Sequence, residues 1–141
     1  MKNILILACM VVLAFGFVSC GKDGSGSSGV YTVQINFYVP DPTKPTTVPV
    51  GQGATFSVTA TQNGKQIDSS DVTVSTFKDS TIETLRIWND GGSIDIQSNE
   101  TITKKYGEIT GCKIGAVSGT GSFGLNVTYK GVTDTVTFGT N

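Results

Sequence analysis

The chain has 141 residues, contains no histidine, and carries ten Lys and Arg against eleven Asp and Glu residues. This length predicts one domain, and the near-balance of charge argues against nucleic acid as a partner, because phosphate binding needs clustered Lys and Arg. The lack of histidine removes the usual general base near neutral pH and the Ser-His and Cys-His nucleophile pairs, and no pair of carboxylates lies in a recognisable motif. We therefore expect a protein that is not an enzyme.

The first twenty residues carry a targeting pattern. A short positive start, Met1-Lys2-Asn3, precedes an almost unbroken apolar stretch over residues 4–18, and Ser19 and Cys20 follow. Fifteen residues are fewer than the roughly 20 that span a bilayer as a helix. The pattern predicts a cleaved helical signal peptide over residues 1–19 rather than a permanent anchor.

Phe17-Val18-Ser19-Cys20 resembles the lipobox of bacterial lipoproteins, with Phe17 in place of the more usual leucine. The resemblance implies that Cys20 becomes the new N-terminus and is lipidated there, so that the protein has the membrane as a partner. Several acyl chains hold a protein stably where one holds it only marginally. The alternative is an ordinary cleaved signal peptide with a chance cysteine.

Residues 20–29 are rich in Gly and Ser and are predicted to be a flexible tether. In lipoproteins of Gram-negative bacteria, an aspartate directly after the lipidated cysteine retains the protein at the inner membrane. Gly21 stands there, so the resemblance implies an outer-membrane location. Lys22-Asp23 is similar to part of a short charged signal for export to the cell surface, which favours a domain that faces the exterior.

Residues 30–141 are predicted to form an all-β domain. Apolar residues alternate with polar ones over 31–39, the pattern of a strand with one buried face, until the prolines of residues 40–45 end it. Residues 54–61 alternate in the same way, and Asn63-Gly64 is a strong hairpin signal. Another strand begins at Val72.

The middle of the domain has a less regular pattern. Strands are predicted over 81–88 and 93–97 around a turn at 89–92, with weaker patterns over 101–106 and 108–116. Residues 123–129 and 132–138 alternate clearly on either side of Lys130-Gly131. That turn predicts that Phe123 lies opposite Phe138 and that Leu125 lies opposite Val136.

Seven to nine short strands in this span predict an immunoglobulin-like antiparallel β-sandwich, with a barrel as the alternative. The stretches VPVGQGATFSVTATQNGKQI (48–67) and GSFGLNVTYKGVTDTVTF (121–138) resemble the opening and closing of a bacterial immunoglobulin-like domain. The centre does not match that family, and Trp88 stands there in what reads as an inserted hairpin.

Trp88 is the main candidate for ligand contact. Leu85 and Ile87 on the same predicted strand suggest that the even-numbered residues point outward, so Trp88 on a sandwich edge, helped by Tyr38 or Tyr106, would stack against a sugar ring or an apolar patch of a protein. The alternative, which we favour on the base rate of tryptophan burial, is that Trp88 packs beneath the long middle segment.

Three other features are weaker indications of a cofactor, metal or reactive site. Residues 119–124 match G-x-G-x-x-G but run into a strand instead of a helix, which predicts a turn. The acidic residues 90, 95 and 100, together with Asn89, offer oxygens to Ca²⁺, but their spacing fits no EF-hand loop. Cys112 is predicted to be buried. We therefore expect no metal and no cofactor.

Two short sequences, Asp79-Ser80-Thr81 and Asp134-Thr135-Val136, resemble an Asp-Ser/Thr-apolar signal at which some Gram-negative bacteria O-glycosylate exported proteins. The resemblance implies glycosylation at Ser80 and Thr135.

Together these observations predict an outer-membrane lipoprotein whose sandwich binds a glycan or a protein without catalysis. The alternative is a structural or accessory subunit of an outer-membrane nutrient-uptake or envelope complex, with no ligand site of its own.

Overall fold

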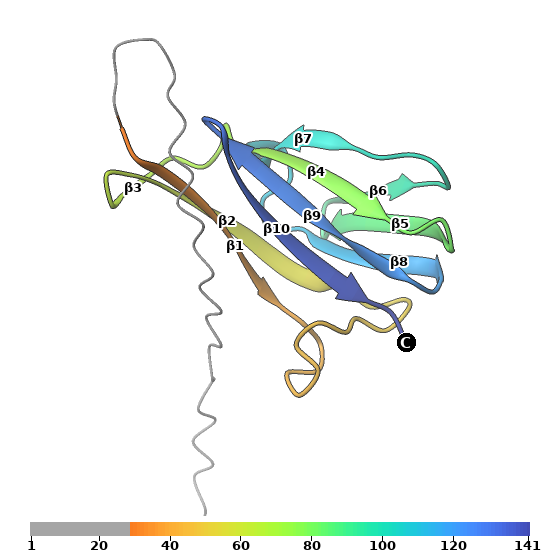
Figure 1. The fold of residues 1–141 in the computed structure, drawn as a ribbon. Coiled ribbons are helices and arrows are strands. Elements are labelled where there is room, and N and C mark those ends of the chain that lie inside the picture. Colours follow the sequence, from red (N-terminus) through yellow and green to blue (C-terminus); the bar gives the residue numbers. More distant parts are fainter. Residues whose placement is uncertain (1–28) are drawn as a thin grey trace, which may run out of the picture.

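A computed structural model describes residues 29–141, which form two antiparallel β-sheets packed face to face (Figure 1). Sheet A contains six strands: β1 (Tyr31–Tyr38), β2 (Ala54–Gln62), β3 (Lys65–Ile67), β5 (Ile82–Asn89), β6 (Gly92–Ile96) and β8 (Lys113–Gly119). Sheet B contains four: β4 (Thr73–Lys78), β7 (Thr103–Lys105), β9 (Ser122–Tyr129) and β10 (Val132–Gly139). The predicted β-sandwich is confirmed.

The strand order follows an immunoglobulin arrangement with additions. Sheet A runs β1-β2-β8-β5-β6, and sheet B runs β10-β9-β4-β7. Strands β1, β2, β8 and β5 correspond to A, B, E and D of a constant-type sandwich, and β10, β9 and β4 correspond to G, F and C. Trp88 therefore lies on a strand of the basic set and not in an inserted hairpin. Only β3, β6 and β7 are added, which brings the total to ten strands instead of the predicted seven to nine.

The two predicted hairpin turns are present. Asn63 and Gly64 join β2 to β3, and Lys130 and Gly131 join β9 to β10, all four with positive φ between 50° and 80°. Positive φ at both central residues is the conformation that fits a two-residue turn to the twist of its strands. The second turn sets the expected register, with Phe123 opposite Phe138 and Leu125 opposite Val136.

The strand predicted over residues 108–116 is wrong in its first half. Residues Tyr106–Glu108 form a short 3₁₀ turn, η1, and β8 begins only at Lys113. The turn continues because the backbone N–H of Ile109 donates to the carbonyl of Tyr106 and that of Cys112 donates to the carbonyl of Ile109. Gly111, with φ at 73°, then reverses the chain into β8, a conformation that other residues adopt at a cost.

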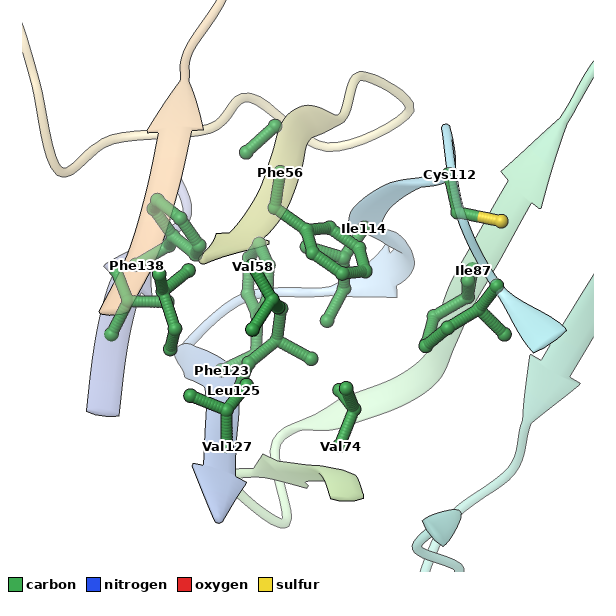
Figure 2. Close-up of a cluster of buried hydrophobic side chains, with 14 of the residues drawn as sticks. Phe56, Val58, Val74, Ile87, Cys112, Ile114, Phe123, Leu125, Val127 and Phe138 are labelled. Carbon is green, nitrogen blue, oxygen red and sulfur yellow. The ribbon is translucent and has the colours of Figure 1, made fainter. Parts of the chain in front are cut away.

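One hydrophobic core fills the space between the sheets. Figure 2 shows Phe56 and Ile114 of sheet A facing Phe123 and Leu125 of sheet B, with Phe138 at one side of the cluster. All of these side chains are at most 2% exposed. Burying a large apolar side chain of this kind contributes about 1.5–3 kcal/mol to stability. The core therefore fixes which face of each strand is left for solvent.

The two sheets are joined along one side by β1 and β10. The backbone N–H of Ile35 donates to the Asp134 carboxylate at 2.8 Å, so a side chain from β10 takes the place of a missing strand partner. Further along, Thr47 forms a parallel bridge with Gly139, and the N–H of Val48 donates to the Gly139 carbonyl at 2.9 Å. The chain thus crosses from sheet A to sheet B within the β1–β2 connection.

Candidate functional site

The outward side of sheet A carries a continuous row of five side chains from five neighbouring strands. Successive cross-strand pairs join them, and cross-strand partners share one face of a sheet. We call this set the Trp88 row: Tyr38 on β1, Thr55 on β2, Lys113 on β8, Trp88 on β5 and Ser93 on β6. The neighbours Leu85 and Ile87 of β5 are buried, as the alternation in the sequence predicts. The row thus brings Trp88 and Tyr38 onto the same surface.

Trp88 lies half-buried on this outer face. It belongs to β5, which pairs with β8 on one side and β6 on the other, so its strand is not the sheet edge that the sequence suggested. A Cβ built on Gly53 would lie 2.4 Å from Cη2 of the indole. The ring therefore extends sideways from β5 across β8, toward the start of β2, and does not pack beneath the middle segment of the chain.

The polar groups of the Trp88 row are not bonded to each other or to their neighbours. Within residues 29–141, none of the five forms a side-chain hydrogen bond or an ion pair. Tyr38 is 65% exposed, and the side chains of Thr55, Lys113 and Ser93 are also exposed. By contrast, Arg86, in the next row on the same face, binds Asp95 through two hydrogen bonds of 2.5 and 2.8 Å.

Tyr106, the third aromatic candidate, is not brought into the row. It lies on η1, directly after the edge strand β7 of sheet B, and its half-buried ring packs against the hydrophobic core. The adjacent pair Lys104-Lys105 lies on β7 itself. These two lysines therefore occupy a sheet edge, where charge discourages further strand pairing.

Ser80 and Thr135, the two predicted glycosylation sites, are both exposed. Ser80 lies in the turn between β4 and β5, and Thr135 lies on β10 with its hydroxyl donating to Asn126 at 2.7 Å. The aspartates beside them are engaged in the fold, because Asp79 accepts from the N–H of Ser122 and Asp134 accepts from that of Ile35. Glycosylation stays a prediction, which a mass shift lost on mutating Ser80 and Thr135 would support.

Three of the four groups that could offer oxygens to Ca²⁺ have another partner, and the fourth, Asp90, is exposed. Asp95 binds Arg86, Glu100 accepts from the N–H of Gln97, and Asn89 accepts from that of Gly91. The described part of the chain contains no cluster of three or more acidic or cysteine side chains that could hold a metal ion. Cys112 is 6% exposed, and its burial raises the pKa of the thiol, which keeps it protonated near neutral pH.

The sequence missed three members of the row, Thr55, Lys113 and Ser93, and the glycine beneath the indole. The alternation of each strand does predict that these residues point outward. Ser93 pairs with Trp88 across the predicted turn of the β5–β6 hairpin, so this local signal could have identified it. The alignment of Thr55 and Lys113 with Trp88 depends on how β8 pairs with both β2 and β5, and neither pairing has a connecting turn that would reveal its register.

Compared with known proteins, the chain matches no protein-family model, no curated protein and no solved structure. No helix within residues 29–141 is long and apolar enough to cross a membrane. The predicted signal peptide and Cys20 lie outside the described residues.

Proposed function

We propose that this protein is a lipoprotein of the outer membrane, held there through lipid on Cys20 and facing the exterior, and that its sandwich is a non-catalytic binding domain. The domain presents the Trp88 row to a glycan or protein at the cell envelope. We propose that the Gly- and Ser-rich sequence over residues 20–29 serves as a tether that lets the domain meet that ligand away from the bilayer surface.

The single observation that carries the binding proposal is the alignment of Trp88 and Tyr38 with three exposed polar side chains in one row. Aromatic rings combine a large apolar surface with a polar edge, which suits them to contacts at wet interfaces. Hydroxyl and ammonium groups beside them fix the orientation of a ligand. The fold by itself would not indicate a function, since sandwiches of this kind serve many.

Anchoring and binding are tested separately. Metabolic labelling with an alkyne fatty acid and intact-mass analysis should show lipid on the native protein. The Cys20→Ser variant should carry no lipid and should no longer be found in the membrane fraction. An uncleaved or unmodified N-terminus would overturn the anchoring.

For binding, the native protein and the Trp88→Ala variant are solubilised in mild detergent, captured from the outer membrane and compared for bound partners and for signals on a glycan array. We expect a partner or glycan that the variant loses. A stoichiometric complex that the variant keeps in full would instead support the accessory-subunit alternative.

A further inference from the structure

The length of the Trp88 row suits an extended ligand. Neighbouring strands lie about 4.8 Å apart, so the three strand steps from Tyr38 to Trp88 span about 14 Å. The backbones of Tyr38 and Trp88 are thus separated by those of Thr55 and Lys113, while the indole reaches back across β8 toward Gly53 at the start of β2. A ligand that contacts the whole row must extend across the strands.

The position of the indole favours a flat ring as its partner. Because Gly53 lacks a side chain, the six-membered part of the indole can lie across β8, where a Cβ would collide with it at 2.4 Å and 2.7 Å. The indole is therefore spread along the sheet, and the part of the half-buried ring that remains exposed can stack on a ligand. Sugar rings present apolar C–H faces of this kind with hydroxyl groups at their edges, which Thr55 and Ser93 can meet.

Lys113 gives the row a charge. Its ammonium group forms no ion pair with any carboxylate in residues 29–141, although Arg86 on the neighbouring strand is fully paired with Asp95. An unpaired cation beside the indole is complementary to an anion carried on a sugar ring. A carboxylate that meets Lys113 would form a charge-assisted hydrogen bond, which is stronger than one between neutral groups.

Resting on the proposed function, we propose that the ligand of the Trp88 row is an acidic oligosaccharide, a linear chain that contains uronic acids. It lies across β1, β2, β8 and β5, with sugar rings on Trp88 and Tyr38 and a uronate carboxylate at Lys113. A single lysine distinguishes this ligand from nucleic acid, which needs several cations. A face with two separated aromatic side chains offers little of the contiguous apolar core of a stable protein interface.

Trp88 is the sole tryptophan of the chain, so its fluorescence reports directly on the site. Full-length protein in mild detergent is titrated with three- to six-unit oligomers of galacturonate, of mannuronate and guluronate, and of glucuronate-containing chains. Neutral oligomers of matched length serve as the comparison. We expect at least one acidic series to bind with saturation, to improve from three to five units, and to weaken in high salt. No saturation by any acidic series, or equal binding of a neutral one, overturns the proposal.

Three variants locate the ligand. Lys113→Gln should lower the affinity for the acidic oligomer about tenfold or more, since a hydrogen bond to a charged group is lost. Tyr38→Ala should lower the affinity for the longer oligomers more than the affinity for the shortest. Lys130→Gln, a change at the exposed β9–β10 turn, is the matched control and should have no effect. Unchanged binding by Lys113→Gln counts against the proposal.

The outcome also separates this inference from the proposed function. Suppose that no oligosaccharide binds, while Trp88→Ala still loses a partner captured from the membrane. The row then binds another class of ligand, and only the proposal of an acidic oligosaccharide is overturned. If Trp88→Ala loses nothing in either experiment, the binding function falls with it.

Discussion

The Trp88 row of sheet A and the outward face of sheet B use their polar side chains differently. On sheet B, the side chains bond to one another across strands: Ser75 with Thr103 at 3.0 Å, Thr128 with Thr133 at 2.9 Å, and Thr135 with Asn126 at 2.7 Å. On sheet A, the Trp88 row has no such bonds within the described residues. A ligand on sheet B would have to replace bonds already made, whereas the row offers groups that now face only water.

The difference shows that an exposed polar strand is not by itself a binding surface. Both faces are polar and both cover the same core, but the Trp88 row brings open hydrogen-bonding groups, an unpaired cation and two aromatic side chains together in one line across the strands. Sheet B is better understood as a face whose cross-strand hydroxyl pairs support the sheet itself.

The largest expected effect comes from the core that holds both faces. Phe138 is fully buried, and its ring contacts those of Phe37 and Phe123 at centroid distances of 5.1 and 5.6 Å. Phe138→Ala should lower the free energy of unfolding by about 3–5 kcal/mol. Urea unfolding followed by circular dichroism and by Trp88 fluorescence should give coincident transitions, because one core supports both sheets.

Phe77→Ala is the matched control. Phe77 is half-buried on the outer face of sheet B, against Gly124. Its truncation should therefore lower the free energy of unfolding clearly less than that of Phe138. Equal losses for the two phenylalanines, or two separate transitions, would contradict a single shared core.

The second effect concerns the side where the two sheets meet. Asp134→Ala leaves the N–H of Ile35 without its acceptor in a partly buried position, and a lost partner of this kind costs about 1–3 kcal/mol. Asp134→Asn keeps an oxygen acceptor, so its free energy of unfolding should fall less than that of the alanine variant. Urea unfolding gives the two values, and hydrogen exchange of the Ile35 amide should quicken most in the alanine variant. Identical losses would show that the bond to Ile35 is not what Asp134 contributes.

The β9–β10 hairpin of sheet B and strands β1 and β2 of sheet A could be predicted from the sequence because their signals are local. Period-2 alternation and the turns Asn63-Gly64 and Lys130-Gly131 determine both which residues are buried and which residues pair. The same local signals placed Trp88 on an outward position.

The middle of the chain could not be predicted in the same way. β5 and β8 pair across an intervening 3₁₀ turn and two other strands, so no turn sets their register, and a bulge between Ile82 and Leu85 shifts it further. Glu108 lies in a 3₁₀ turn, although apolar and polar residues alternate around it as in a strand. The chain reverses direction at Gly111, and the alternation does not reveal this reversal. Thr55 and Lys113 are aligned with Trp88 through the pairings of β8, which is why these two polar members of the row were missed.

A smaller effect tests how the indole is seated on sheet A. Gly53→Ala places a methyl group against the ring, so Trp88 must move outward, and its emission should shift to longer wavelength. Stability should change by no more than about 1 kcal/mol, because a stiffer unfolded chain offsets the displaced ring. Gly139→Ala, whose added Cβ meets nothing within 4 Å, is the control and should leave the emission unchanged. An unshifted emission in Gly53→Ala would mean that the indole does not lie over Gly53.

The smallest effect comes from the one ion pair on the outer face of sheet A. The hydrogen bond from Arg86 lowers the pKa of Asp95 below its ordinary value of 3.8. A lowered pKa means that the folded protein binds fewer protons than the unfolded chain in acid, so the pair contributes stability above pH 3.8 that is lost as pH falls through the lowered value. Asp95→Asn should therefore reduce Tm slightly at pH 7 and not at pH 2, and added salt should shrink the difference at pH 7, because both side chains are more than a third exposed. If acidic oligosaccharide binding falls strongly in Asp95→Asn, although this change frees a second cation on the face, the Arg86–Asp95 pair is itself part of the ligand site, and the separation drawn between the paired and the unpaired cation is wrong.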